Sequence, residues 1–181
     1  MRVCVLGSGS KGNSTLVATE KTRLLVDAGL NRREMFARLA AVGERTDGFD
    51  AILISHEHTD HVNGLRLLGM EWKAPIFITR LTHEAVSWDP KLSAFDFFSA
   101  GQKFVVGDIQ VTPFSIPHDA VDPVAFTLEA EGVKIGVVTD LGLFMKLLSR
   151  EYKAVIVSSS SRITIWICSK SGRIRGTLNS A

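Results

Sequence analysis

Four side chains that can bind metal ions fall within six consecutive positions of the sequence ISHEHTDHVNG, residues 54–64. They are His56, His58, Asp60 and His61. Neutral imidazole nitrogens and carboxylate oxygens are ligands for zinc and also for manganese or iron. A structural role accounts well for one histidine near a strand end, but poorly for four such residues so close together. The segment therefore predicts a metal site.

The elements on either side of this segment should aim its ligands at two neighbouring points. A short apolar strand precedes it, and residues two apart in an extended chain share a side, so His56 and His58 should face one centre. A helix predicted over 61–72 places Asp60 and His61 at its start, where both can face a second centre. Two adjacent cations could share a hydroxide and stabilise a hydrolytic transition state from both sides.

Four ligands do not complete two sites, so further ligands should lie at other strand ends. His118 in FSIPHD and Asp140 in IGVVTD each follow an apolar segment, and we expect both to bind metal. Asp27 in RLLVDAG also ends a predicted strand and is suited to orient a ligand through a hydrogen bond. His83 has no such neighbours and is expected to be structural.

Strand-like segments dominate both halves of the chain and helices intervene, which indicates an α/β or α+β fold built in layers. Gly107-Asp108 and Glu131-Gly132 are expected to turn two hairpins. Strands are predicted within 2–7, 14–20, 23–29, 51–55, 75–80, 103–118, 124–140 and 152–157. Helices are predicted over 31–43, 61–72, 81–88 and 142–149.

The glycine-rich sequence GSGSKGNS after the first strand matches a dinucleotide-binding fingerprint and nearly matches a P-loop. The first requires a helix to follow, but NSTLVATE alternates as a strand does; the second requires a lysine where Asn13 stands. Two interpretations remain: a tight turn that needs positive φ, or a loop whose backbone N–H groups meet an anion. The candidate phosphate-binding residues are Ser8, Gly9, Ser10, Lys11, Gly12 and Asn13.

The composition fits one globular domain, with 45% apolar residues and no apolar run near the roughly 20 residues of a membrane helix. The N-terminus is typical of a first strand rather than of a signal peptide, and two cysteines give no disulfide framework, so we expect a cytoplasmic location. Residues 158–181 contribute +4 to a net charge of +2, which leaves −2 for the other 157 residues. Nucleic-acid binding therefore cannot be argued from charge. We expect no membrane association and no obligate protein partner.

The pattern His56-x-His58-x-Asp60-His61 after an apolar strand resembles the signature of the metallo-β-lactamase superfamily. GSGSKGNS, LLVDAG, ISHEHTDH, IPHD and TDLG extend the resemblance to the YycJ/WalJ-like branch, over residues 1 to about 157. The resemblance implies an αββα sandwich with two divalent metal ions, zinc or manganese, at one edge of its sheets. In the assignment that the resemblance implies, the first metal is bound by His56, His58 and His118. The second is bound by Asp60 and His61, and Asp140 bridges the two metals.

The same resemblance implies a metal-dependent hydrolase, and for this branch a DNA exonuclease that cleaves phosphodiester bonds with a metal-activated hydroxide. Asp60 could help to position that hydroxide by a hydrogen bond. Two alternatives stay open. One is a small-molecule ester or thioester hydrolase with the same site, and the other is a non-catalytic remnant that binds at most one metal.

The superfamily pattern closes with another histidine late in the chain, whereas the five histidines here end at His118. After KAVIV, a YycJ-like chain continues with sequences such as ESNHDLDML and GPYPW. This chain has SSSSRITIWICSKSGRIRGTLNSA instead. We therefore expect a metallo-β-lactamase-like domain at 1–157, incomplete at its C-terminus, and an atypical tail at 158–181. Without the closing histidine the second metal should bind weakly.

The coding DNA of the tail offers a direct test of its origin. Codons can be chosen for the tail whose bases, read two nucleotides later from within Ser160, spell ESNHDLDMLKIGPYPWYLEQR. Codon degeneracy gives such an exercise freedom, yet Trp166 fixes its codon and isoleucine and cysteine leave few choices. Our hypothesis is a frame slip at about Ser160. Sequencing of the coding DNA should reveal codons that also encode the family-like sequence in the shifted reading frame. Codons incompatible with that frame would refute the hypothesis.

Overall fold

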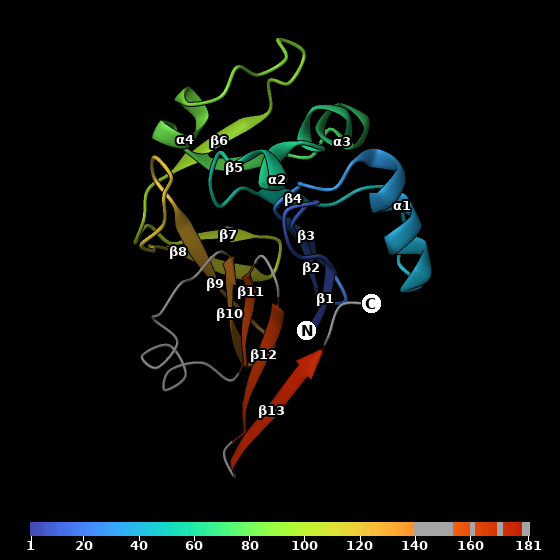
Figure 1. Cartoon of the computed structure of the whole chain (residues 1–181), viewed down its shortest axis with the longest axis vertical. Helices are drawn as coiled ribbons and strands as arrows, with labels where there is room; N and C mark the ends of the chain where they lie inside the picture. The colour runs from blue at the N-terminus through green and yellow to red at the C-terminus, as the bar shows by residue number, and fades with distance from the viewer. Residues whose placement is uncertain (140–153, 160–161, 170–171, 179–181) are drawn as a thin grey trace.

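Two β-sheets pack face to face in the computed structural model, shown in Figure 1. The structure describes residues 1–139 in full and the backbone of 154–159, 162–169 and 172–178. The first sheet has the order β1-β2-β3-β4-β5-β6 and the second β13-β12-β11-β10-β9-β8-β7. Strands β1 to β3 pair antiparallel and β3 to β6 pair parallel, whereas β10 and β11 form the parallel pair of the second sheet.

The strands largely occupy the predicted segments. Those of the first sheet are β1 (Arg2–Gly7), β2 (Ser14–Ala18), β3 (Arg23–Val26), β4 (Ala51–Leu53), β5 (Ile76–Thr79) and β6 (Phe95–Phe98). Those of the second are β7 (Phe104–Val106), β8 (Ile109–Ser115), β9 (Val124–Ala130), β10 (Val133–Thr139), β11 (Ala154–Ser159), β12 (Arg162–Ser169) and β13 (Gly172–Leu178). Strand β6 was not predicted, and neither were β12 and β13, which continue the second sheet through the tail.

Alternation along the strands fills two separate cores. In β2, Leu16 belongs to the core beneath the helices, while its neighbour Val17 belongs to the core between the sheets. Leu25 and Leu24 of β3 divide in the same way. Because both faces of the first sheet are covered, the residues of its middle strands β3 and β4 are all buried, and all but Arg23 are apolar. Among the described residues the helices therefore lie on the first sheet and that sheet on the second, as expected for the predicted αββα sandwich.

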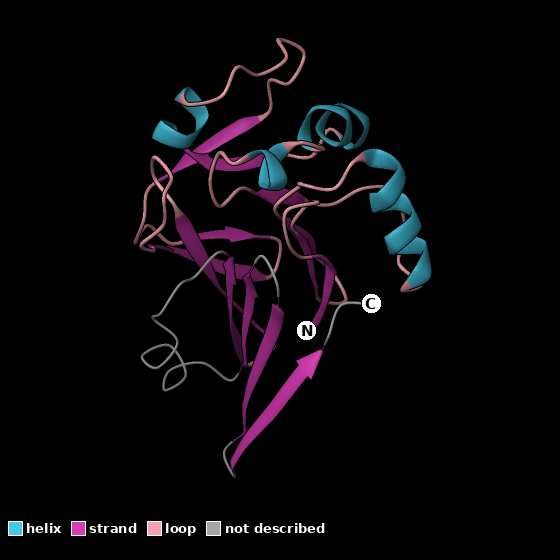
Figure 2. Cartoon of the chain, viewed as in Figure 1, coloured by secondary structure: helices cyan, strands magenta, loops and turns pink. Residues whose placement is uncertain are grey.

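The helices cover the side of the first sheet that faces away from the second, as Figure 2 shows for α1 and α3. They are α1 (Arg32–Ala41), α2 (Thr59–Val62), α3 (Leu65–Trp72) and α4 (Arg80–Glu84). Helix α1 begins as predicted, with Asn31 accepting a hydrogen bond from the N–H of Glu34. No helix among the described residues is long and apolar enough to span a membrane. The helix predicted over 142–149 lies outside the described residues.

The single helix predicted over 61–72 is wrong, because the chain forms α2 and α3 with a break at Asn63 and Gly64. The break has a packing cause. A Cβ atom on Gly64 would lie 1.9 Å from the carbonyl oxygen of Leu30, so the backbone of the break presses directly on the loop after β3. The N–H of Gly64 donates to the carbonyl of Ala28 at 2.8 Å. This contact ends α2 after one turn and fixes it against β3.

Three strand ends bring the predicted site residues that the structure describes to one edge of the sandwich. Strands β3 and β4 are parallel neighbours, so Asp27 and the segment from Ser55 emerge on the same side. The loop after β8 carries His118 to them, and the N–H of Val124 at the start of β9 donates to the carbonyl of Ser55 at 3.0 Å. Asp140 directly follows β10 but lies outside the described residues.

The close approach of two loops at this edge predicts a strong effect of one methyl group. A Cβ atom on Gly29 would lie 1.6 Å from the carbonyl oxygen of Asp60, so Gly29→Ala must force the two segments apart. We expect it to lower the free energy of unfolding by more than about 2 kcal/mol in denaturant titrations. Gly101→Ala is the control, since nothing lies within 4 Å of its Cβ position and its positive φ costs about 1 kcal/mol. Equal losses for the two variants would contradict the packing argument.

Candidate metal centre

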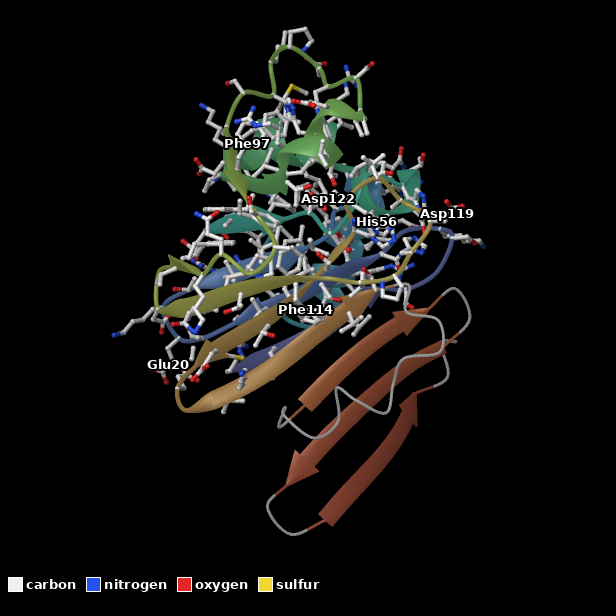
Figure 3. All side chains as sticks on the ribbon, turned by 90° about the vertical axis from the view of Figure 1, so that its left-hand side faces the viewer. Glu20, His56, Phe97, Phe114, Asp119 and Asp122 are labelled. Atoms are coloured by element: carbon white, nitrogen blue, oxygen red, sulfur yellow. The ribbon has the colours of Figure 1, made fainter. Side chains whose placement is uncertain are left out.

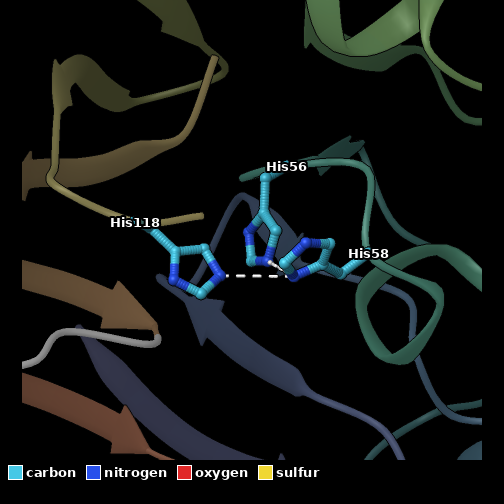
Figure 4. Close-up of side chains that lie close together, drawn as sticks. All are labelled: His56, His58 and His118. Atoms are coloured by element: carbon cyan, nitrogen blue, oxygen red, sulfur yellow. Dashed lines mark hydrogen bonds between the residues drawn. The ribbon is translucent and has the colours of Figure 1, made fainter. Parts of the chain in front are cut away.

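Three imidazole rings converge at the edge of the sandwich, two from the segment after β4 and one from the loop after β8, as Figure 4 shows. Nε2 of His56 lies 3.1 Å from Nδ1 of His58, and Nε2 of His118 lies 3.2 Å from the same atom. One ligand atom from each ring lies within 4.8 Å of the others. The structure therefore brings together His56 and His58, as their spacing predicts, and adds His118 from 60 residues away.

The donor atoms fit a tetrahedral cation. Three nitrogens bound to zinc at its usual distance lie about 3.4 Å from one another in a tetrahedron, close to the two short separations between the rings. His56 is fully buried, and burial together with the neighbouring His61 lowers the pKa of His56 from its ordinary 6.5 to about 4. The imidazole of His56 is thus neutral near pH 7 and has a lone pair to give to a metal.

One buried carboxylate orients two of the histidines. Asp27 is fully buried and accepts from the N–H and the hydroxyl of Ser55, both at 2.9 Å. It also accepts from Nδ1 of His61 at 2.8 Å, so the lone pair of that ring lies on Nε2. Ser55 Oγ in turn lies 2.9 Å from Nδ1 of His56, which leaves Nε2 of that ring to face the other histidines. Asp27 therefore makes hydrogen bonds to Ser55 and His61, and its role in orienting metal ligands stays a prediction.

The predicted ligands of a second centre, Asp60 and His61, lie beside the first. The rings of His56 and His61 are 4.0 Å apart between centroids, and Asp60 Oδ2 lies 3.7 Å from His61 Nε2. Both residues belong to α2 and are held by the same short helix. The third predicted ligand of this centre, Asp140, lies outside the described residues.

The glycine-rich loop between β1 and β2 acts on this second pair through Asn13. The Asn13 side chain, only 2% exposed, places Nδ2 2.9 Å from both Asp60 Oδ2 and His61 Nε2. Its Oδ1 accepts from the N–H of Gly9 at 2.9 Å, and its own N–H donates to the Asp60 carbonyl at 2.7 Å. Sequence reasoning named Asn13 as a phosphate contact, but its polar atoms already meet the protein. The signal that sequence reasoning missed is an asparagine directly beyond a glycine turn.

The rest of the loop divides into buried support and exposed contacts. Gly12 has φ of +138°, and its N–H donates to the carbonyl of Gly9 at 2.9 Å, so a tight turn is confirmed. A strand and not a helix follows, which agrees with the rejection of a nucleotide-binding loop. The residues of the loop that are exposed to solvent are Ser10 and Lys11, whereas Ser8 is half-buried.

His83 lies in α4 within an aromatic cluster apart from the other four histidines. Its ring centroid is 4.6 Å from that of Phe95 and 5.2 Å from that of Phe97, and Trp88 donates to its carbonyl at 2.8 Å. These contacts agree with the structural role that its isolation in the sequence suggests.

The chain matches the model of the metallo-beta-lactamase superfamily over residues 7–151, which is most of its length. The chain belongs to this superfamily. It is 34% identical over 143 residues to "Exodeoxyribonuclease WalJ" of Streptococcus pneumoniae serotype 2 (strain D39 / NCTC 7466), with 76% of this chain and 53% of the relative covered. It is 33% identical over 145 residues to "Exodeoxyribonuclease YycJ" of Bacillus anthracis, with the same coverage. The chain thus spans about half the length of these curated relatives.

Solved structures of the superfamily share the fold at low sequence identity. A B3 metallo-beta-lactamase with an active-site glutamic acid superposes with a TM-score of 0.68 at 16% identity, over 87% of this chain and 76% of the other. The metallo-beta-lactamase fold protein YhfI from Bacillus subtilis gives 0.67 at 17% identity, over 84% and 68%. The α+β sandwich of the superfamily is therefore the fold of this chain.

In this superfamily member the role of Asp27 can be tested with an isosteric change. Asp27 has φ of 61°, a conformation that asparagine also tolerates, so Asp27→Asn leaves the backbone unstrained. It replaces an acceptor oxygen with a donor facing Ser55 or His61, and we expect zinc affinity to fall about 10- to 100-fold. Competition with a chromophoric chelator measures this, with the exposed Asp96→Asn as control. Unchanged affinity in Asp27→Asn would show that the carboxylate orients no ligand.

Proposed function

We propose that the chain is the metal-binding part of a hydrolase that cleaves phosphodiester bonds in DNA. The convergence of His56, His58 and His118 on one point carries the proposal, because three neutral imidazoles at these separations are suited to hold a divalent cation. The two relatives named as exodeoxyribonucleases support DNA as the substrate. Since the chain spans about half of each, the activity of a whole protein is part of the proposal.

The proposed ligand sets combine the geometry of the described residues with the family resemblance. His56, His58 and His118 would hold the first cation, zinc or manganese, and Asp60 and His61 would hold a second. Asp140, outside the described residues, is the proposed shared ligand. Such cations activate water as a nucleophile and offset negative charge on the attacked phosphoryl group. Asp27 accepts from His61 directly and reaches His56 through Ser55. In each ring the lone pair therefore lies on Nε2, the atom proposed to bind the metal. Asp60 is partly exposed and has a second oxygen available to position the attacking water.

The exposed part of the glycine-rich loop is the proposed contact for substrate phosphate. Lys11 is exposed on the loop that Asn13, two residues later, anchors to the turn at Asp60. An ammonium group there is placed to attract a phosphate that neighbours the cleaved bond. Ser10 can add a hydroxyl and a backbone N–H to the same anion.

A small-molecule ester or thioester hydrolase remains the second candidate. The same metal chemistry serves a carbonyl as well as a phosphoryl group, and the net charge of −2 on residues 1–157 gives no general attraction for a polyanion. A positively charged groove would favour DNA by counterion release, which this charge balance does not supply.

Turnover on two substrates with two histidine variants tests the proposal. The purified chain, loaded with zinc or manganese, is expected to degrade a labelled DNA duplex and to leave a small thioester intact. His118→Ala should bind metal far more weakly and lose DNA cleavage, because it removes one of three ligands. His83→Ala is the matched control and should keep both, since His83 packs in a separate aromatic cluster.

Three outcomes would count against the proposal in different ways. Hydrolysis of the thioester but not of DNA would favour the second candidate. Bound metal without turnover on either substrate would identify a non-catalytic remnant. Full metal content in His118→Ala would overturn the ligand assignment itself.

A further inference from the structure

The loop that carries His118 joins β8 to β9 and needs contacts with other parts of the chain to hold His118 in place. It runs from Ile116 to Pro123, and the N–H of Ile116 donates to the carbonyl of Pro123 at 3.1 Å, which closes its base. His118 is half-buried near the far end of this loop, where a displacement of about 1 Å would separate its Nε2 from the other ligands. Figure 3 labels Asp119 and Asp122 of the same loop near His56.

Glu57 connects this loop to the segment that bears the other two histidines. It lies between His56 and His58 in the sequence, so its side chain leaves the extended segment on the opposite side from theirs. Its Oε1 accepts from the backbone N–H of Val121 at 2.8 Å, across 64 residues of sequence. The contact therefore ties the peptide three residues beyond His118 to the residue between its two partners.

A second contact holds the neighbouring peptide from the other side. The hydroxyl of Thr82 in α4 donates to the carbonyl of Asp122 at 3.4 Å. This hydrogen bond is long and joins the loop to a helix that bears no proposed ligand. The bond from Glu57 is shorter and acts directly between the two ligand-bearing segments.

The hydrogen bond to Val121 is the one that the Glu57 side chain makes within the described part of the chain. Its other oxygen, Oε2, is buried and has no hydrogen-bond partner among the described residues. The contact of Glu57 with the described residues is therefore directed at the loop that carries His118.

We propose that Glu57 is a positioning residue that fixes His118 relative to His56 and His58. The inference rests on the proposed metal site and adds a residue to it: Glu57 does not touch the metal but holds the loop that supplies the third ligand. Its effect on affinity should pass through His118 alone, which separates positioning from a general attraction between a carboxylate and a cation.

Zinc affinity of two Glu57 variants distinguishes these roles. Glu57→Ala removes the acceptor for Val121 and should weaken zinc binding about 10- to 100-fold in chelator competition. Glu57→Gln removes the charge but keeps an oxygen that can accept, so it should stay within about threefold of the wild type. Equal weakening in both variants would show that charge, and not position, is what Glu57 supplies. The exposed Glu84→Ala is the control for loss of a carboxylate elsewhere and should leave zinc affinity unchanged.

The double variant with His118→Ala tests the route of the effect. If Glu57 acts through His118, Glu57→Ala should weaken zinc binding no further once His118 is absent. Amide hydrogen exchange in the metal-free protein gives an independent readout: the Val121 N–H should exchange faster in Glu57→Ala than in Glu57→Gln. Additive losses of zinc affinity, or equal exchange rates, would overturn the inference.

Failure of this inference can be told from failure of the proposed function. A wild-type chain that binds no zinc defeats the proposed metal site. A wild-type chain that binds zinc, with Glu57→Ala binding equally well, leaves that site standing and removes only the role of Glu57.

Discussion

The buried carboxylate of Asp27 is the contact on which the rest of the site depends. It leaves the end of β3 in a left-handed conformation, fully buried, and accepts from the backbone and hydroxyl of Ser55 and from His61. Through these contacts it determines which ring nitrogen carries the proton in His56, a proposed ligand of the first metal, and in His61, a proposed ligand of the second. A charge placed at the end of a rigid strand thus orients groups that arise from a different strand and a helix. The cost of burying it is offset by three hydrogen bonds.

Glycines are needed around the site because backbone segments approach each other closely there, more than because the chain must be flexible. Gly29 and Gly64 allow the loop after β3 to press on both ends of α2, where a Cβ atom on either would overlap a backbone carbonyl. After the turn at Gly12, Asn13 bonds to Asp60 and His61 and accepts from the N–H of Gly29. The sequence that imitates a nucleotide-binding loop is therefore part of the support for α2. Because a helix of one turn is not stable by its own hydrogen bonds, α2 depends on these close contacts with the two neighbouring loops.

Much of this arrangement could be predicted because the informative residues are local. Spacing alone placed His56 and His58 on one side, and their positions at strand ends indicated that Asp27 and His118 would lie near them, as they do; their roles toward a metal stay predictions. The break between α2 and α3 could not be predicted, since it arises from contact of Gly64 with a loop 34 residues earlier. Nor could the role of Asn13 or Glu57, because their partners are distant in sequence and a pattern of residue types does not reveal pairing. Strand β6 lacks clear alternation, and the tail strands β12 and β13 carry no period that would have marked them. The origin of the tail and the place of Asp140 stay predictions.

Anomalous diffraction at the zinc absorption edge, from crystals of the chain grown with one equivalent of zinc, tests the central claim most directly. The account predicts one strong peak bonded to His56 Nε2, His58 Nδ1 and His118 Nε2 at about 2.0–2.1 Å from each nitrogen. A peak on another group of side chains, or a zinc ion that contacts only one of these histidines, would contradict it.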